Sequence, residues 1–387
     1  MSCLLDQSLT IGLDARALHR QERRGTGKNL ADLYEHVLRL RPGWRVIGYC
    51  RDRATLDAFG GQGYQARLVD LPGDRFHAWE RWRLPLAAWR DGVDLLHCPA
   101  NTCPTWNPTP MALTVHDLLP LESTVFDAHR FRQSVEHVVR SQSPIITPSA
   151  YTASLLRKRF NAGDGQVTVI PWAADSSMKY LAPGEARSRL CAQYGVSEPF
   201  ILHLGATDPR KNTQALIRAF SAVAPIVRSR WKLLVIGIED PAWMEELDAQ
   251  LAALGCRDHV ILHAYAPRED LSALFSAASI LAYPSRAEGF GLPVLDAWAT
   301  RTAVLTSHVT SLPEVAGDAA LLVDPHDLCS IARGLGKLMA EFRLRELLIR
   351  RGTARLAGYS WQRTAQMFID LVERTIAQRE EGLRLAA

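Results

Sequence analysis

The 387-residue sequence lacks any run of about 18 uncharged apolar residues, the length that a membrane-spanning helix needs. Its first residues, 1–12, also lack the basic start and apolar stretch of a secretory signal. These absences predict a cytoplasmic protein, and they leave a contact with the inner face of the membrane open. The seven cysteines are scattered, and the closest pair, Cys98 and Cys103, has neither CxxC spacing nor a second pair. No zinc site is expected.

The sequence also has little excess of positive over negative charge. The formal net charge is only +4, without a dense stripe of lysine and arginine, so nucleic acid is not expected as a partner. With 47% hydrophobic and 22% charged residues, the composition is that of a globular protein and excludes a disordered or collagen-like chain. At this length, two domains are the default expectation.

Short apolar runs alternate with segments of helical length along the whole chain. The runs are 11–13, 46–50, 95–97, 112–115, 145–147, 167–170, 200–204, 233–236, 260–263, 280–283, 303–306 and 320–323. Continuous apolar strands separated by helices are typical of parallel sheets covered on both faces. The sequence therefore predicts an α/β protein of two doubly wound, Rossmann-like domains facing each other across a cleft.

Proline and glycine mark where the domains divide. The stretch 171–199 contains no strand pattern but holds Pro171, Pro183, Gly184 and Gly195, which favours an interdomain connection there. We expect an N-terminal domain over 1–180, a C-terminal domain over 181–360, and a helix over 361–387 that crosses back to the N-terminal domain. Apolar residues at three- and four-residue steps also predict one helix over 212–227.

A glycine-rich loop follows the apolar run 280–283. In the stretch 285–296, Gly289 and Gly291 let the backbone approach a ligand, and Pro293 suits the first turn of a helix whose free amides can receive phosphate oxygens. Glu288 and Asp296 bracket this loop. Carboxylates there could accept hydrogen bonds from sugar hydroxyls, although each taken alone could be an ordinary surface or helix-start residue.

Two cations follow the run 200–204. Arg210 and Lys211 precede a helix, where their charge opposes the helix dipole, so a role other than capping is favoured. They could stabilise a diphosphate as its bond to a sugar breaks. The sequence contains no Asp-x-Asp pair for a metal, and we expect neither a catalytic metal nor a cofactor.

The segment Glu-Gly-Phe-Gly-Leu-Pro at 288–293 resembles the signature of retaining glycosyltransferase family 4, in which two glutamates are separated by seven residues. The second is aspartate here. The resemblance implies a GT-B fold, contact of Glu288 with the donor sugar and contact of Asp296 with the ribose. It also assigns further residues to the donor site: Gly205, Gly237, Tyr265, Gly289, Phe290, Gly291 and Leu292.

Two places in the first half of the chain extend the resemblance. Family members have a Gly-x-Gly near the donor phosphates and the acceptor, and Gly25 and Gly27, which follow Arg24, match it. By itself this pair lacks the spacing of an NAD or ATP motif. His116 follows the run 112–115 where the family has a histidine lining the cleft near the donor sugar, although it could also be a satisfied turn residue.

The Pro-Arg-Lys-Asn form of 209–212 is similar to that of family members in surface polysaccharide assembly, mannosyl- and rhamnosyltransferases among them. The resemblance implies metal-independent, retaining transfer of a hexose from a nucleoside diphosphate sugar, with GDP-mannose as the first guess, to a glycan or a lipid-linked acceptor. A nucleotide-sugar epimerase of the same fold and a catalytically silent nucleotide-sugar-binding subunit remain alternatives.

The stretch 75–90 is rich in arginine and tryptophan. Trp79, Trp82 and Trp89 share a helical stripe with Leu86, and Pro85 would interrupt a single helix. The stripe is consistent with a buried core face and equally with a shallow contact with a membrane, since aromatic and cationic residues suit that interface. The sequence leaves both interpretations open.

Overall fold

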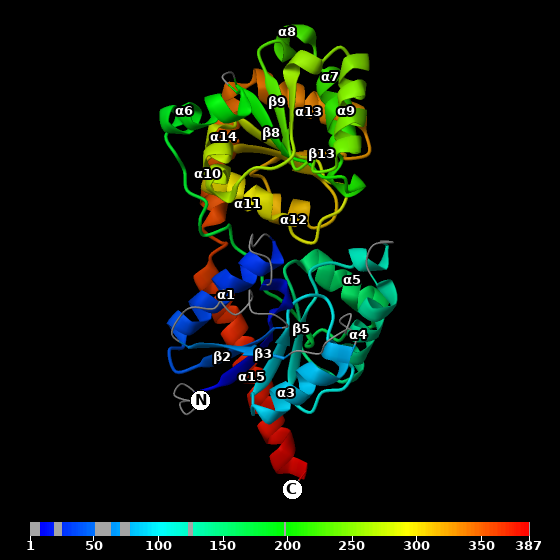
Figure 1. Cartoon of the computed structure of the whole chain (residues 1–387), viewed down its shortest axis with the longest axis vertical. Helices are drawn as coiled ribbons and strands as arrows, with labels where there is room; N and C mark the ends of the chain where they lie inside the picture. Colours follow the sequence, from blue (N-terminus) through cyan, green and yellow to red (C-terminus); the bar gives the residue numbers. More distant parts are fainter. Residues whose placement is uncertain are drawn as a thin grey trace. The chain divides into compact units, whose positions relative to one another are not determined.

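A computed structural model describes residues 8–18, 25–50, 63–69, 78–122, 127–196 and 199–386. The chain forms two compact units (Figure 1): the first unit contains residues 1–172 and 361–387, and the second contains residues 173–360. The second unit thus begins at Ala173, whereas the sequence suggested a division near residue 180. Arg24 and residues 75–77 lie outside the described residues.

The described part of the first unit is built on a seven-stranded parallel sheet with the order β3-β2-β1-β4-β5-β6-β7. Its strands are β1 (Thr10–Asp14), β2 (Arg45–Cys50), β3 (Tyr64–Leu68), β4 (Leu95–Cys98), β5 (Met111–Thr114), β6 (Ile145–Thr147) and β7 (Val167–Val169). The predicted apolar runs form six of these strands. The seventh, β3, was not predicted, because it lies at the edge of the sheet, half exposed, and has no apolar run.

The second unit repeats the plan with six described parallel strands in the order β10-β9-β8-β11-β12-β13. They are β8 (Phe200–Leu204), β9 (Lys232–Ile236), β10 (Val260–His263), β11 (Ile280–Tyr283), β12 (Ala303–Ser307) and β13 (Leu321–Val323). Each unit has its own apolar core between sheet and helices. This confirms the predicted class, α/β with two doubly wound Rossmann-like domains.

Helices connect the strands in both units. In the first unit they are α1 (Thr26–Leu40), the π-helix η2 (Trp79–Arg83), α3 (Leu84–Arg90), α4 (Ala128–Arg140), α5 (Ala150–Phe160) and α15 (Trp361–Ala386). In the second they are α6 (Pro183–Tyr194), α7 (Thr213–Ser221), α8 (Pro225–Arg228), α9 (Pro241–Ala253), α10 (Arg268–Ala277), α11 (Leu292–Ala299), α12 (Leu312–Ala316), α13 (Leu328–Ala340) and α14 (Phe342–Leu356). The prediction of one helix over 212–227 is wrong. Pro225 has no amide hydrogen to donate, and it starts the separate helix α8.

The last helix returns to the first unit. In Figure 1, α15, drawn in red, lies beside α1, drawn in blue. The rings of Phe368 and Tyr34 meet edge to face at 5.7 Å, and Arg41 Nε lies 3.0 Å from Glu373 Oε1. The Thr364 hydroxyl donates to the Pro171 carbonyl at 2.7 Å. The first unit therefore closes with a helix that comes after the whole of the second.

None of the helices within the described residues is long and apolar enough to cross a bilayer.

Candidate active site

The candidate site of the second unit lies where its strands end. Because all its strands are parallel, their carboxyl ends meet at one edge of the sheet. The loop 205–212 follows β8, the loop 284–291 follows the neighbouring strand β11, and residues 308–311 follow β12. The two motifs found in the sequence are therefore adjacent in space.

Asn212 fastens these loops together. Its backbone is left-handed, with φ of 63°, and its buried side-chain amide donates to the carbonyl oxygens of Pro284 at 3.1 Å and Pro325 at 2.7 Å. The Arg286 amide also donates to the Arg210 carbonyl at 2.8 Å. These bonds fix the turn that carries Arg210 and Lys211, so the two cations are presented from a rigid backbone.

Lys211, Tyr283 and Glu288 form a closed triangle of hydrogen bonds. Lys211 Nζ donates to Glu288 Oε1 at 2.8 Å and to the Tyr283 hydroxyl oxygen at 2.9 Å, and that hydroxyl donates to Glu288 Oε1 at 2.6 Å. Burial alone would lower the pKa of Lys211, but Tyr283 and Glu288 outweigh it and hold that pKa well above its usual value. Burial raises the pKa of Tyr283, and the Glu288 carboxylate raises it further. The site thus holds a fixed ammonium, a neutral phenol and a carboxyl group at one point.

Arg210 is a second cation, next to Lys211 in the loop after β8, and has its own carboxylate partner. Its guanidinium Nε lies 2.9 Å from Asp208 Oδ2, and the Asp208 carboxylate also accepts from the Arg210 amide at 2.9 Å. Burial would raise the pKa of Asp208, but bonds to Arg210 dominate and lower it. The ion pair orients the guanidinium, whose side chain remains about one-third exposed and able to meet an anion.

Three glycines of the predicted donor site are explained by packing within the protein. A Cβ atom on Gly237, where φ is +103°, would stand 2.4 Å from the Gly205 carbonyl oxygen, and a Cβ on Gly205 would meet Ile238 and Val235 at 2.9 Å. Gly291, with φ of +111°, would meet Leu312 at 2.7 Å. These positions exclude larger residues because the loops themselves are close together.

The remaining predicted donor-site residues lie in the glycine loop, at the start of α11 and in the loop after β10. Gly289 and Phe290 are buried, and the Phe290 ring packs against Tyr359 at 6.0 Å. Leu292 is the half-buried first residue of α11, and Tyr265 is half-buried in the loop between β10 and α10. Phe290 therefore supports the loop from within.

Asp296 lies on α11, behind the glycine loop. Its Oδ1 accepts a hydrogen bond from the Asp175 amide at 2.9 Å, and the Asp175 carboxylate pairs with Arg268 at 3.1 Å. The shorter aspartate thus holds the first residues of the second unit. This contact is a structural role that the sequence did not indicate.

The other predicted site residues belong to the first unit. His116 Nε2 lies 2.8 Å from the Pro99 carbonyl, which can only accept, so Nε2 carries the proton and Nδ1 is the basic nitrogen. Burial lowers the pKa of His116, which keeps the imidazole neutral. Gly25 precedes α1 with φ of +55° and is exposed, and no atom of the described residues lies within 4 Å of a Cβ placed on it, whereas a Cβ on Gly27 would meet the Ala17 carbonyl at 2.4 Å. Packing inside the first unit therefore accounts for Gly27 but not for Gly25.

Sequence reasoning missed three residues that hold Glu288. Tyr283 is the last residue of strand β11, and in the sequence it was interpreted as one more apolar residue of a buried strand. Thr310 accepts from the Glu288 amide at 3.2 Å, and the Ser311 hydroxyl donates to the Glu288 carbonyl at 2.9 Å. A polar hydroxyl at the end of a strand, five residues before a carboxylate, is the one signal that the sequence offered.

Among the residues that the structure describes, no group of three or more histidine, cysteine, aspartate and glutamate side chains could hold a metal ion. The loops after β8 and β11 carry the cations Arg210, Lys211 and Arg286.

Comparison with known proteins agrees with this architecture. Residues 193–355 match the family model of glycosyl transferases group 1. The O-antigen chain mannosyltransferase B of Escherichia coli is 32% identical over 231 residues, which are 59% of this chain and 60% of that protein. The chain thus spans about three fifths of the length of this curated relative.

Solved structures match the fold over nearly the whole chain. The glycosyltransferase WaaG, involved in lipopolysaccharide biosynthesis, matches 94% of this chain and 99% of its own with a TM-score of 0.72 at 15% identity. Anabaena Alr3699/HepE, in complex with UDP and glucose, matches 95% and 100% with a TM-score of 0.74 at 16% identity. Two doubly wound domains of this kind define a GT-B protein. Residues 193–355, most of the second unit, thus match the glycosyl transferases of group 1, in agreement with the resemblance seen in the sequence.

Proposed function

We propose that this protein transfers a hexose, with mannose as the first candidate, from a nucleoside diphosphate sugar to a glycan or a lipid-linked acceptor, with retention and without a metal. The observation that carries the proposal is the Lys211–Tyr283–Glu288 triangle at the carboxyl edge of the second sheet, with Arg210 beside it. The mannosyltransferase relative supports mannose as the transferred sugar, and the UDP and glucose bound to the HepE structure support nucleotide sugars as donors in general.

The proposed chemistry follows from charge. The bond between the anomeric carbon and the diphosphate oxygen breaks, its electron pair stays on the diphosphate, and an acceptor hydroxyl oxygen bonds to the anomeric carbon. The departing diphosphate takes the acceptor's proton. Lys211 and Arg210 stabilise the charge that grows on the diphosphate, as preorganised cations do best in a partly buried site. Glu288 accepts from hydroxyls of the transferred sugar.

Glu288 is suited to a position beside the transferred sugar and the diphosphate because Lys211 balances its charge. A carboxylate that faced the leaving diphosphate alone would repel it, but here one oxygen is bound by an ammonium and a phenol. Asp296 serves the ribose from the helix behind the loop. Gly25 and the neutral His116 would serve the donor phosphates and the acceptor from the first unit.

The decisive experiment incubates the purified protein with GDP-mannose and a panel of other nucleoside diphosphate hexoses, each with and without excess chelator. Transfer or slow release of mannose from GDP-mannose, unchanged by chelator, supports the proposal, and NMR of the product tests for retention. Interconversion of the donors would indicate an epimerase, and binding without turnover would indicate a silent binding subunit. Turnover that chelator abolishes and Mg²⁺ or Mn²⁺ restores would contradict the metal-free mechanism.

A further inference from the structure

The arginine- and tryptophan-rich segment of the first unit has one buried and one exposed side. The π-helix η2 runs directly into α3. Trp79, Leu84 and Ala88 are buried in the core, whereas Trp82 and Trp89 are 54% and 57% exposed. The single stripe expected from the sequence is therefore divided, with Trp79 in the core and its two neighbours in solvent.

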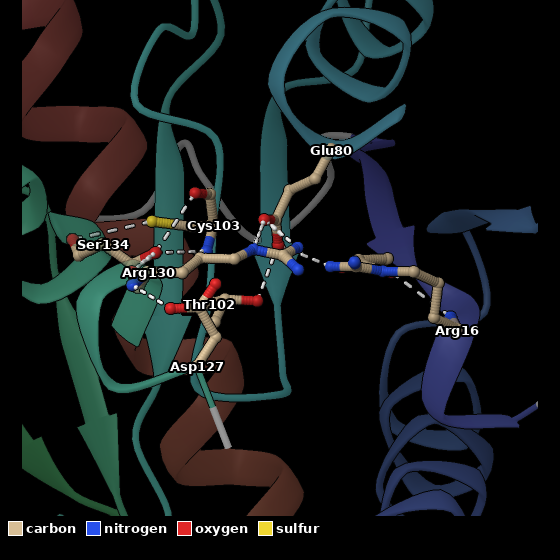
Figure 2. A network of polar contacts seen from close by, with 8 residues as sticks. Arg16, Glu80, Thr102, Cys103, Asp127, Arg130 and Ser134 are labelled. Atoms are coloured by element: carbon tan, nitrogen blue, oxygen red, sulfur yellow. Dashed lines mark hydrogen bonds and ion pairs between the residues drawn. The ribbon is translucent and has the colours of Figure 1, made fainter. Parts of the chain in front are cut away.

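A buried cluster of charges holds this segment in place. Figure 2 shows the Glu80 carboxylate between the guanidinium groups of Arg16 and Arg130. Glu80 Oε1 accepts from Arg16 Nη2 and from the Thr102 hydroxyl at 2.6 Å each, and Oε2 accepts from Arg130 Nε at 2.6 Å. Burial would raise the pKa of Glu80, but the two arginines prevail and lower it.

The ion pairs of Glu80 also fix the helix that carries the exposed tryptophans. Glu80 lies next to Trp79, whose ring Nε1 donates to the Val69 carbonyl at 2.5 Å and whose face is covered by the Arg16 guanidinium at 5.0 Å. Trp82 and Trp89 are thus displayed by a firmly packed helix. They are seven residues apart, close to two helical turns, and so lie on one side.

A third tryptophan joins them from another part of the chain. Trp106 is 47% exposed, and its ring centroid lies 6.1 Å from that of Trp82 with the planes tilted by 42°. It belongs to the stretch 99–110, which contains no charged residue. We call the surface of Trp82, Trp89 and Trp106, with the exposed Arg81, Arg83 and Arg90, the tryptophan face.

The charge of this face has one sign. Within 78–90 the only acidic residue is Glu80, which is buried and ion-paired, whereas all three arginines are exposed. Large exposed apolar groups gathered in one region mark an interaction site. Tryptophan and arginine together suit the boundary of a lipid bilayer, where the indole takes the level of the headgroups and the guanidinium meets anionic lipid.

We propose that the tryptophan face docks the first unit on an anionic membrane surface. A stacked sugar is the less suitable occupant, because the Arg81 guanidinium lies 5.4 Å from the Trp82 ring centroid and the neighbouring Trp106 ring is tilted. The two indoles therefore form no flat platform. Docking needs no donor or transfer, so it can fail or hold independently of the proposed reaction.

The test is flotation of the full chain, without nucleotide sugar, with vesicles of phosphatidylcholine alone or mixed with phosphatidylglycerol. We expect binding only to the anionic vesicles, weakening as salt rises. Trp82→Ala with Trp89→Ala should reduce the partition coefficient about tenfold or more. Arg81→Gln and Arg90→Gln should each reduce it about fivefold. The matched control is Phe342→Ala, which removes a 60% exposed aromatic from the second unit and should bind as the wild type does.

Circular dichroism and melting of each variant establish that the fold is kept, since none of these side chains is buried. Wild-type protein that fails to float with anionic vesicles, or a tryptophan double variant that floats as well as the wild type, overturns the proposal. Loss of affinity for soluble polysaccharide in the same double variant, with flotation unchanged, would reassign the face to glycan binding.

Discussion

Lys211 Nζ and Glu288 Oε1, which are 77 positions apart in the sequence, lie 2.8 Å apart and share the hydroxyl of Tyr283. The cation is thus held at the donor-side loop by a carboxylate and a buried phenol. Removal of any one member leaves the other two with an unsatisfied partner, and this makes the triangle testable residue by residue.

Tyr283→Phe should lower the rate constant for transfer about tenfold or more, because Glu288 and Lys211 each lose a buried hydrogen bond. The Michaelis constant for the donor should change much less, since Tyr283 positions other groups. The matched control is Tyr194→Phe, which removes a buried hydroxyl bonded to Asp270 at 3.0 Å in the same unit. Equal losses in both variants would mean that Tyr283 is only structural.

Lys211→Ala should lower turnover about a hundredfold, more than it weakens donor binding, because the ammonium acts on charge that develops as the bond breaks. Lys232→Ala, which removes a lysine bonded to the Asp258 carbonyl at the start of β9, serves as the control. Steady-state and single-turnover rates separate the two effects. Weaker binding with an unchanged rate constant would show that Lys211 is a ground-state anchor.

Glu288→Gln and Asp296→Asn should fail differently. The first should cut transfer strongly but leave GDP affinity nearly intact. The second should weaken GDP binding about tenfold or more, as expected for loss of a charged acceptor worth about 1.5–3 kcal/mol. Asn keeps an oxygen for the Asp175 amide, so the segment that Asp296 holds should remain in place. Calorimetric titration with GDP, with the exposed Glu245→Gln as control, checks both, and the reverse pattern would exchange the two roles.

Gly237→Ala should destabilise the second unit by about 3 kcal/mol or more, because its Cβ would stand 2.4 Å from the Gly205 carbonyl oxygen at a φ of +103°. Gly255→Ala shares a positive φ but has nothing within 4 Å, so it should cost only the backbone strain of about 1–2 kcal/mol. Denaturant unfolding of the two variants compares them. A similar loss in both would mean that the loops after β8 and β9 separate easily.

Buried histidines, His97 and His203 among them, make the free energy of unfolding depend on pH. Burial lowers the pKa of His97 to about 3, with the neighbouring imidazole of His116 disfavouring a second proton, and burial lowers the pKa of His203 to about 4. Between pH 6.5 and these values the unfolded chain binds a proton that the folded unit does not. The free energy of unfolding should therefore fall as pH falls through this window, by about 1.4 kcal/mol per pH unit for each histidine.

His203→Gln should reduce this slope in the second unit, where burial also lowers the pKa of His263, and leave it unchanged in the first, which contains His97. Calorimetry between pH 7 and pH 4 follows the two units. An unchanged slope for the second unit would show that other groups carry its acid sensitivity.

The amino-acid sequence by itself determined most strands of both units and the resemblance to a glycosyltransferase family. Strands buried on both faces must be continuously apolar, so the runs ending at Leu204 and Tyr283 could be read directly. Strand β3 lies at an edge, where burial imposes no such pattern, and it could not be read. The glycine loop and the Arg210-Lys211 pair were local motifs, visible because their chemistry depends on neighbours in the chain.

Only the tertiary structure decided which residues meet. The Lys211–Glu288 pair and the Gly205–Gly237 contact each join loops after different strands, and their closeness follows from parallel strands ending at one edge. The same holds for burial, since Trp79 and Trp82 are equally apolar in sequence. Glu80, paired with arginines from η1 (Ala15–Leu18) and α4, fixes which of the two enters the core. Long-range packing sets that choice, and a single sequence does not encode it in any local pattern.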